Sequence, residues 1–437
     1  MLDRDAHWIA DAAGATLHRP ARDGAAGPAT VSTDSRDAGA SGALFVGIPG
    51  ARVDGGSFAR QVLDAGAWGV LVRPEHAEDL DGADGAVLLH PDPVAALGTL
   101  ARAWRRELAA TVVGVTGSVG KTSTKDLLAA IVGRERRTVA TVGNLNTEVG
   151  LPLTVLRAPR GTEVLVLEMA MRGAGQIAEL ARIAEPDVGV ITNVAPVHVE
   201  LLGSIAAIAD AKAELLHGIV PGGVAVIPAA ERLLDAHRPG GVRIVTFGPG
   251  GDVERAPGDL AIEGDVPPTV LRNLPAAVAA ARAVGVDPTG TVRPAISALR
   301  GERLTLADDV VVVVDCYNAN PMSVTAALDD LALAGGERRV AVLGDMLELG
   351  PDARRHHAEI GAHARAAGVE VLVAVGELCR HAGPGFGGRV HWVPDAEAAA
   401  RLVPTLLEPG DRVLLKASRG IGLERVAEAL RERGHDR

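Results

Sequence analysis

The sequence predicts an α/β protein of three domains: a small α/β domain, a central domain with a mostly parallel sheet wrapped by helices, and a Rossmann-like domain. Two observations predict it. The 437 residues exceed what one hydrophobic core usually supports. Short runs of Val, Ile, Leu and Ala alternate along the chain with amphipathic stretches of helical length, which is typical of strand–helix units. We expect a small N-terminal domain at residues 1–92, a central domain at 93–299 and a Rossmann-like C-terminal domain at 300–437.

Within the first domain, apolar runs at residues 43–48 and 69–72 predict strands, and residues 57–65 predict a helix. Pro91 and Pro93 break the chain before an amphipathic helix at 94–108. Further runs predict strands at 111–115, 164–167, 188–192, 223–227 and 243–247, and helices at 123–132, 205–217 and 273–284. A second alternating series predicts strands at 310–314, 340–343, 369–375 and 412–416, and helices at 324–333, 353–367, 396–407 and 423–433.

Composition excludes several classes of protein. The net charge is −11 and no dense cluster of Lys and Arg interrupts it, so we expect no nucleic-acid partner. The first twenty residues lack an uninterrupted apolar core and no later run is long enough to span a bilayer. We therefore expect a cytoplasmic protein without membrane insertion. Cys316 and Cys379 are too few for a disulfide framework, and we expect both to be reduced.

A glycine-bearing loop with the pattern TGxxGKT lies between a predicted strand and a predicted helix. That context favours a phosphate-binding loop over a chance glycine-rich turn. Glycines allow backbone N–H groups to approach phosphates, and the helix N-terminus adds its dipole. Lys121 is expected to reach the β and γ phosphates, and the Thr122 hydroxyl to bind Mg²⁺. The expected nucleotide-binding residues are Thr116, Gly117, Ser118, Gly120, Lys121 and Thr122.

The TGxxGKT loop resembles that of the Mur ligases, and the likeness continues beyond it. Segments 143–147 (GNLNT) and 150–154 (GLPLT) are similar to the family's substrate-side segment, and Glu168 and His198 to its second-metal residues. Segments 315–321 (DCYNANP), 343–350 (LGDMLELG) and 416–424 (KASRGIGLE) resemble the branch of the family that adds D-alanyl-D-alanine to UDP-N-acetylmuramoyl-tripeptide. The resemblance implies a UDP-sugar-peptide-binding domain, a central ATPase and a dipeptide-binding domain. We expect a monomer, an expectation that no motif in the sequence supports.

The resemblance implies a ligase that uses ATP and two Mg²⁺ ions. The substrate carboxylate becomes an acyl phosphate, and the amine displaces phosphate through a tetrahedral intermediate. Lys121, Glu168, His198 and Lys212 would be catalytic, and Thr122, Glu168, His198 and carbamylated Lys212 would hold the metal. Glu168 has independent support, because it follows an apolar run and so ends a strand where parallel sheets bind ligands. Without the resemblance, His198 favours a packing role, and the role of Lys212 rests on analogy alone.

The resemblance also assigns nucleotide and substrate contacts. Asn273 matches an adenine-contacting residue, although it would serve equally well as a helix N-cap. Asp315 matches a residue near the ribose, and either Arg303 or Arg300 supplies the nucleotide-contacting arginine. For the substrates it implies contacts from Ser35, Arg36, Asn144, Asn146, Thr147, Asn318, Asn320, Asp345 and Arg419. By themselves, Asn318, Asn320 and Asp345 could also be turn formers.

Three positions depart from the family pattern. Gly56 stands where the family usually has His, Cys316 replaces Ser and Ala417 replaces Gly. Two other functions stay open: a different carboxylate–amine ligase of the same superfamily, such as an earlier sibling or a folylpolyglutamate-type enzyme, and a nucleotide-binding regulatory protein without catalysis. The third residue of the accepted peptide, lysine or diaminopimelate, is also left open.

Overall fold

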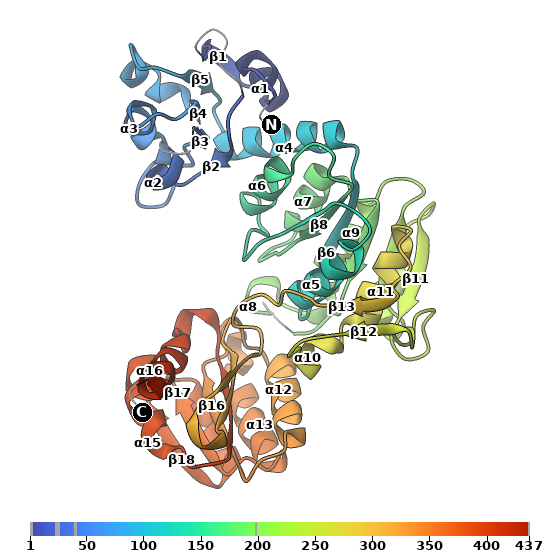
Figure 1. The fold of residues 1–437 in the computed structure, drawn as a ribbon, viewed down its shortest axis with the longest axis vertical. Helices are drawn as coiled ribbons and strands as arrows, with labels where there is room; N and C mark the ends of the chain where they lie inside the picture. Colours follow the sequence, from blue (N-terminus) through green and yellow to red (C-terminus); the bar gives the residue numbers. More distant parts are fainter. Residues whose placement is uncertain (1–2, 22–26, 39–41, 197–198, 436–437) are drawn as a thin grey trace.

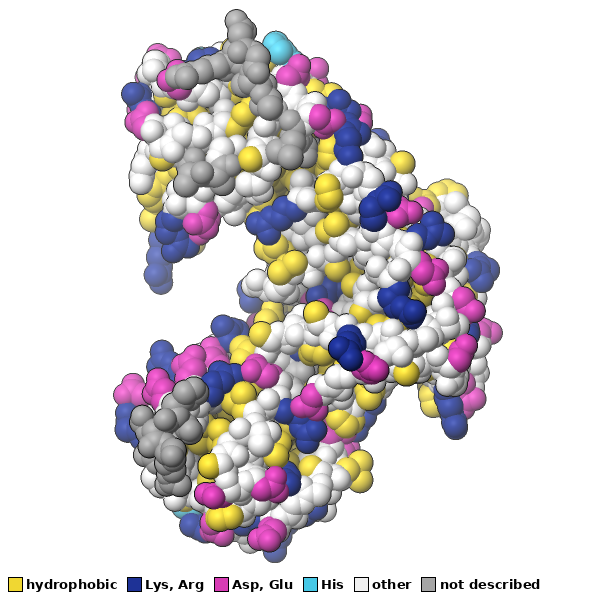
Figure 2. Space-filling model, in the orientation of Figure 1, with side chains coloured by type: hydrophobic (Ala, Val, Ile, Leu, Met, Phe, Trp, Pro, Cys, Tyr) yellow, Lys and Arg dark blue, Asp and Glu magenta, His cyan; other side chains and the backbone are white. Residues whose placement is uncertain are grey.

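The computed structural model describes residues 3–21, 27–38, 42–196 and 199–435. Three α/β units follow one another along an arc, with the first and third at its ends and the second between them (Figure 1). The space-filling view shows a deep hollow on the inner side of the arc (Figure 2). The predicted α/β class with mostly parallel sheets is confirmed.

The first unit carries a sheet of five strands in the order β1-β5-β4-β3-β2, in which only β1 runs antiparallel to its neighbour. Both faces of β3 are buried: Leu44 and Val46 join a core shared with α1, whereas Phe45 packs in the core that contains α3. The elements are β1 (Thr16–Arg19), β2 (Val31–Ser32), β3 (Leu44–Val46), β4 (Gly69–Val72), β5 (Ala86–Leu89), α1 (Ala6–Ala13), α2 (Ser35–Ala38) and α3 (Ala59–Asp64).

Helix α4 (Pro93–Leu108) joins the first unit to the second. The Asp92 side chain caps it by accepting hydrogen bonds from the first-turn amides of Val94 and Ala95. Trp104 is buried, and its indole N–H donates to the carbonyl of Ala158 at 3.0 Å. Apolar side chains of α4 belong to one continuous core with α1 and with the central strands. The first unit is therefore packed onto the second.

The central sheet has six parallel strands in the order β11-β10-β9-β6-β8-β7. The chain leaves β6 toward β7 and β8 on one side and returns to β9 on the other, which creates a crevice at the carboxyl end of β6. The elements are β6 (Thr111–Thr116), β7 (Thr138–Ala140), β8 (Val164–Glu168), β9 (Val188–Ile191), β10 (Val224–Pro228), β11 (Arg243–Phe247), α5 (Lys121–Val132), α6 (Gly150–Arg157), α7 (Gln176–Ala184), α8 (Val199–Leu202) and α9 (Ile205–His217).

A small two-stranded sheet of β12 (Leu260–Ile262) and β13 (Gly290–Val292) follows, with α10 (Pro268–Leu271) and α11 (Leu274–Ala283) between its strands. The third unit has six strands in the order β14-β15-β19-β16-β17-β18, with only the edge strand β14 antiparallel. Its elements are β14 (Glu302–Thr305), β15 (Val311–Asp315), β16 (Arg338–Gly344), β17 (Val371–Val375), β18 (Arg389–Val393), β19 (Asp411–Lys416), α12 (Pro321–Leu333), α13 (Ala353–Ala366), α14 (Ala382–Phe386), α15 (Ala396–Leu406) and α16 (Glu424–His435).

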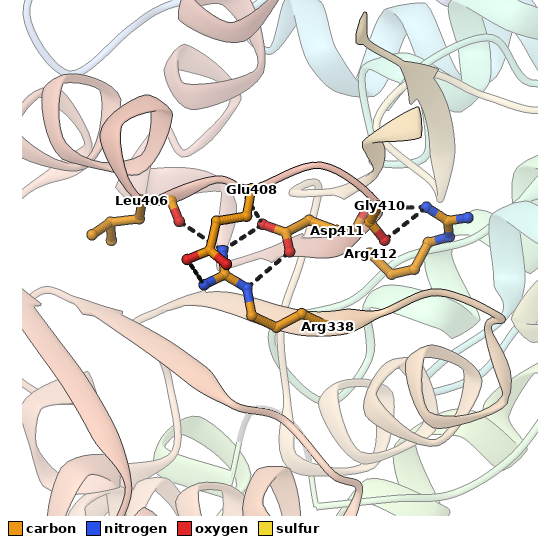
Figure 3. Close-up of polar contacts among 6 residues, drawn as sticks. All are labelled: Arg338, Leu406, Glu408, Gly410, Asp411 and Arg412. Carbon is orange, nitrogen blue, oxygen red and sulfur yellow. Dashed lines mark hydrogen bonds and ion pairs between the residues drawn. The ribbon is translucent and has the colours of Figure 1, made fainter. Parts of the chain in front are cut away.

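An arginine–carboxylate cluster holds the amino ends of β16 and β19 together (Figure 3). Arg338 donates from Nε and Nη2 to the two carboxylate oxygens of Asp411, at 2.9 and 2.8 Å, and from Nη2 to the Leu406 carbonyl at 2.7 Å. Glu408 pairs with the same guanidinium and donates its own N–H to Asp411 at 2.8 Å. Because Asp411 is fully buried, its charge depends on these partners.

The ends of the predicted elements lie within three residues of the observed ends. Helix α5 begins at Lys121, two residues before its predicted start, because Gly120 adopts a left-handed conformation at φ 84° and the helix follows at once. Both cysteines are free and buried, and burial raises the pKa of each thiol to about 12. Within the described ranges, no helix is long and apolar enough to cross a membrane.

Candidate active site

The loop between β6 and α5 has the shape that its glycines allow. Gly117 has φ 149°, and a Cβ there would lie 1.8 Å from the Thr192 hydroxyl oxygen. A Cβ on Gly120 would lie 2.2 Å from Oδ1 of Asn273. Both positions therefore require glycine, because backbone conformation and neighbouring atoms exclude a side chain. The Thr116 side chain faces away from the loop and donates to the carbonyl of Met169 at 2.9 Å.

The segment after β9 fixes this loop. Asn193 accepts from the Ser118 N–H through its carbonyl at 3.1 Å and from the Val119 N–H through Oδ1 at 2.9 Å. Its own amide donates to the Val119 carbonyl at 2.9 Å. The Ser118 hydroxyl donates to the Ala195 carbonyl at 3.0 Å. These bonds hold the loop in one conformation and leave the first-turn amides of α5 as the donors for an anion. Sequence reasoning gave Asn193 no role in shaping the loop.

Two cationic side chains flank the start of α5. Lys121 Nζ donates to the Gly117 carbonyl at 2.8 Å, and burial lowers its pKa, an effect that the Glu168 carboxylate opposes. Arg300 Nη2 donates to the Thr122 hydroxyl at 3.2 Å, and its guanidinium lies 4.0 Å from the centre of the Tyr317 ring. The Nε of Arg300 is buried and has no acceptor among the described residues. It is thus a free donor beside the loop.

Of the two predicted arginines, the structure brings Arg300 to the loop. Arg303 instead forms an exposed ion pair with Asp265, at 3.0 Å. Leu299, which precedes Arg300, has φ 60°, and Gly301, which follows it, has φ 83°, so the chain turns sharply on either side of Arg300. This turn sends the two arginine side chains to different surroundings.

Glu168 ends β8 as predicted and is buried. Its Oε1 accepts from Asn146 Nδ2 at 2.7 Å, and its backbone N–H donates to the Thr141 hydroxyl at 2.9 Å. Its Oε2 is buried without a hydrogen-bond partner among the described residues. An uncompensated buried carboxylate oxygen is costly and fits a metal ligand. Asn144 and Thr147, from the same predicted substrate segment, are exposed.

Lys212 lies on α9 with 2% of its surface exposed. Its ammonium has no hydrogen-bond or ion-pair partner within the described part of the chain. Burial lowers its pKa well below the ordinary lysine value, and the Lys121 charge lowers it further. The predicted metal ligand His198 lies outside the described residues.

A cavity of about 240 Å³ lies where the second and third units meet. Asn273 contributes to it. This residue stands at the N-cap position of α11, as one interpretation predicted, but its side chain donates to the Thr269 and Val270 carbonyls and makes no cap hydrogen bond. Asp315 accepts from Lys416 at 2.6 Å. The lining residues are Ser118, Val119, Gly120, Lys121, Thr122, Ser123, Asn193, Thr269, Val270, Arg272, Asn273, Arg300, Asp315, Asn318, Asn320, Met322, Ser323, Ala326 and Lys416.

The residues predicted to bind the dipeptide already have local partners. Asn318 accepts from the Ala319 N–H at 2.9 Å, and Asn320 caps α12 in a reciprocal box with Ser323. Asp345 accepts from the Cys379 N–H at 2.7 Å, and Arg419 pairs with Glu424 at 2.7 Å. Only the two asparagines among these four line the cavity between the units.

In the first unit, Ser35 begins α2 and the exposed Arg36 pairs with Asp34, whose pKa it lowers to about 2. Asp54 binds Arg73 at 2.5 Å and His76 at 2.9 Å. A Cβ on Gly56 would lie 2.3 Å from His76 Nε2. His76 therefore occupies the space into which a side chain at position 56 would project.

Comparison with known proteins agrees with this geometry. Three family models match: "Mur ligase family, catalytic domain" at residues 29–105, "Mur ligase middle domain" at 115–263 and "Mur ligase, glutamate ligase domain" at 299–419. The UDP-N-acetylmuramoyl-tripeptide--D-alanyl-D-alanine ligase of Synechocystis is 37% identical over 92% of this chain and 91% of its own length. The corresponding Bacillus subtilis ligase is 34% identical over 89% and 90%.

Solved structures give the same result. A crystal structure of MurF from Acinetobacter baumannii is similar with a TM-score of 0.86 and 27% identity, covering 99% of this chain and 100% of that one. MurF ligase from Thermotoga maritima in complex with ADP is similar with a TM-score of 0.79 and 28% identity, over 93% and 98%.

Proposed function

The chain belongs to the Mur ligase family, and on that premise we propose that it joins D-alanyl-D-alanine to UDP-N-acetylmuramoyl-tripeptide, with ATP converted to ADP and phosphate. The observation that carries the proposal is the cavity between the second and third units. One wall is the TGxxGKT loop, and the opposite wall includes Asn318 and Asn320 of the third unit. A nucleotide and an amine substrate held on these two walls would meet at the same place.

The residues present fit Mg²⁺. The Thr122 hydroxyl and the unpartnered Oε2 of Glu168 are hard oxygen donors of the kind that Mg²⁺ prefers. When bound, the ion would neutralise charge on the phosphates and the substrate carboxylate. We assign a second ion to His198 and to carbamylated Lys212. The buried Lys212 amine supports this role, because a lysine that loses its proton can add to CO₂ to give an anionic carbamate and a released proton.

The chemistry requires activation of a carboxylate. A carboxylate oxygen attacks the γ-phosphorus, the bond to the β-phosphate oxygen breaks, and ADP leaves. The dipeptide amine, after losing a proton, then attacks the acyl carbon, and the tetrahedral intermediate expels phosphate as the amide forms. Lys121 and Arg300 lie where negative charge gathers during the first step, and fixed cations there lower its barrier.

The three units divide the substrates among them. We assign the UDP-sugar-peptide to residues 1–92, with Ser35 and Arg36 near the diphosphate, and to Asn144, Asn146 and Thr147 of the central unit. ATP belongs to residues 93–299, with Asn273 and Arg300 as contacts, and Asp315 close to the ribose. The dipeptide belongs to residues 300–437, with Asn318, Asn320, Asp345 and Arg419. We propose that the protein acts as a cytoplasmic monomer in peptidoglycan precursor synthesis.

Phosphate release tests the proposal. The purified protein is given ATP, Mg²⁺ and UDP-N-acetylmuramoyl-tripeptide, with D-alanyl-D-alanine or with L-alanine, L-lysine, D-glutamate or L-glutamate in its place. We expect release only with the dipeptide. Release with a single amino acid would assign the protein to a sibling ligase, and ATP binding without release under any condition would favour a regulatory protein. Tripeptides ending in lysine or diaminopimelate then define the third residue.

A further inference from the structure

A buried ion pair lies on α5, one helical turn beyond the phosphate loop. Lys125 and Asp126 have side chains only 4% and 6% exposed, with Nζ and Oδ1 2.5 Å apart. Lys125 Nζ also donates to the Thr141 carbonyl at 2.8 Å. Burying two charges is unfavourable unless further hydrogen bonds satisfy them. The residue that supplies these bonds to Asp126 therefore shows what the pair holds in place.

That partner is Ser297, which lies in the connection between the second and third units. Its N–H donates to Asp126 Oδ2 at 2.9 Å, and its hydroxyl donates to Oδ1 at 3.2 Å. Three residues later, Arg300 donates to the Thr122 hydroxyl. Thr122 and Asp126 are four residues apart and therefore lie on the same side of α5. The connection thus runs along the helix and is attached to it at two points.

The backbone between the two attachments is held in an unfavourable conformation. Leu299 has φ 60°, in the left-handed region that is unfavourable for a residue other than glycine. Such a conformation persists where the surroundings enforce it. The bonds at Ser297 and Arg300, on either side of Leu299, provide that constraint.

We infer that Asp126 is a positioning residue for nucleotide binding: by fixing Ser297, it places the Arg300 guanidinium beside Thr122 in the nucleotide cavity. The inference rests on the proposed function, in which that cavity receives ATP. Arg300 is a long side chain, and holding its backbone in advance reduces the entropy lost when it meets the phosphates. The pair also ties the connection to the third unit, so the position of the third unit follows the nucleotide helix.

The test measures ADP and ATP affinity by calorimetry on the full chain, with the variants Asp126→Asn, Arg300→Gln and the double variant. We expect each single change to weaken binding by about tenfold, the size of one charge-assisted hydrogen bond. If Asp126 acts through Arg300, the double variant binds no more weakly than Arg300→Gln alone. Additive losses, or a stability loss with unchanged affinity in Asp126→Asn, would overturn the inference.

Two further variants separate positioning from packing. Thr124→Ser alters a buried side chain on the same helix whose hydroxyl has no hydrogen-bond partner among the described residues, and its nucleotide affinity should match wild type. Ser297→Ala removes the hydroxyl that donates to Asp126 and accepts from Lys125, and it keeps the N–H bond to Asp126, so a smaller loss of about threefold is expected. This variant tests the inference even if Asp126→Asn folds poorly. Wild-type protein that binds ATP without releasing phosphate would refute the proposed function alone; unchanged affinity in Ser297→Ala and Asp126→Asn would refute this inference alone.

Discussion

Each end of strand β19 carries an ion pair between a basic side chain and a carboxylate, but the two pairs have different surroundings. At its amino end, the carboxylate of Asp411 is fully buried and accepts hydrogen bonds from Nε and Nη2 of Arg338 (Figure 3). At its carboxyl end, Lys416 donates to Asp315 at 2.6 Å and to the Asn318 carbonyl at 3.0 Å. The second pair lines the cavity between the second and third units, whereas neither Arg338 nor Asp411 is among the described residues that line it.

The difference shows that residue type alone does not indicate a role. The amino-end pair has all its partners inside the third unit and joins β16 to β19, so it serves the fold. The carboxyl-end pair faces the cavity from the edge at which parallel sheets bind ligands. We therefore expect charges at the amino ends of strands to determine stability, and charges at the carboxyl ends to determine activity.

Arg338→Met gives the largest expected effect at the amino end. It leaves the buried Asp411 charge without its main partner, so the free energy of unfolding should fall by about 3–5 kcal/mol. Urea unfolding followed by circular dichroism measures this loss. The turnover of the molecules that remain folded should match wild type, and a loss below about 1 kcal/mol would contradict a structural role for the pair.

Glu168→Gln, at the carboxyl end of β8, should lower turnover and leave stability unharmed, the reverse of the effect of Arg338→Met. Losing the carboxylate that we propose as a metal ligand should lower turnover by about a hundredfold to a thousandfold. The free energy of unfolding should stay equal or rise, because the unpartnered buried charge of Oε2 is removed while the oxygen that accepts from Asn146 is kept. Phosphate release and urea unfolding on the same preparation check both. Lower stability with normal turnover would reverse the assignment.

The sequence predicted the parts of the site that depend on local order. The loop glycines, Lys121, Thr122 and Glu168 at the end of β8 all lie in short segments whose strand and helix are readable from apolar spacing. The box at Asn320 and Ser323 also has a local pattern, a polar cap followed by Pro and then Ser, although it was not predicted.

Contacts between distant segments could not be predicted in this way. Lys416 meets Asp315 only because β15 and β19 are neighbours, and strand order is not written in either segment. Asn193 shapes the loop across the interface between β6 and β9. Arg300 and Arg303 are three residues apart, and the side-chain partners of each, Thr122 for Arg300 and Asp265 for Arg303, come from distant segments.

Asp315→Asn tests the carboxyl-end pair directly. We expect nucleotide binding to weaken by about tenfold, through the loss of one charge-assisted contact and of the hold on Lys416. The stability loss should be smaller than in Arg338→Met, because Lys416 keeps its bond to the Asn318 carbonyl, whereas Arg338→Met removes two guanidinium bonds from the buried Asp411 carboxylate. Calorimetry with ADP and urea unfolding measure the two effects. Equal stability losses in the two variants would remove the distinction between the strand ends.

Arg401→Ala supplies the reference for a short ion pair without burial. Arg401 and Glu397 lie one turn apart on α15, 2.6 Å from each other, with side chains 68% and 67% exposed. Solvent screens this pair, so the free energy of unfolding should change by less than about 0.5 kcal/mol, and still less in high salt. Urea unfolding at two salt concentrations measures it. The Arg338 and Arg401 ion pairs have similar distances and differ in burial. If Arg401→Ala lowered the free energy of unfolding as much as Arg338→Met, burial would not explain why one pair stabilises the fold more than the other.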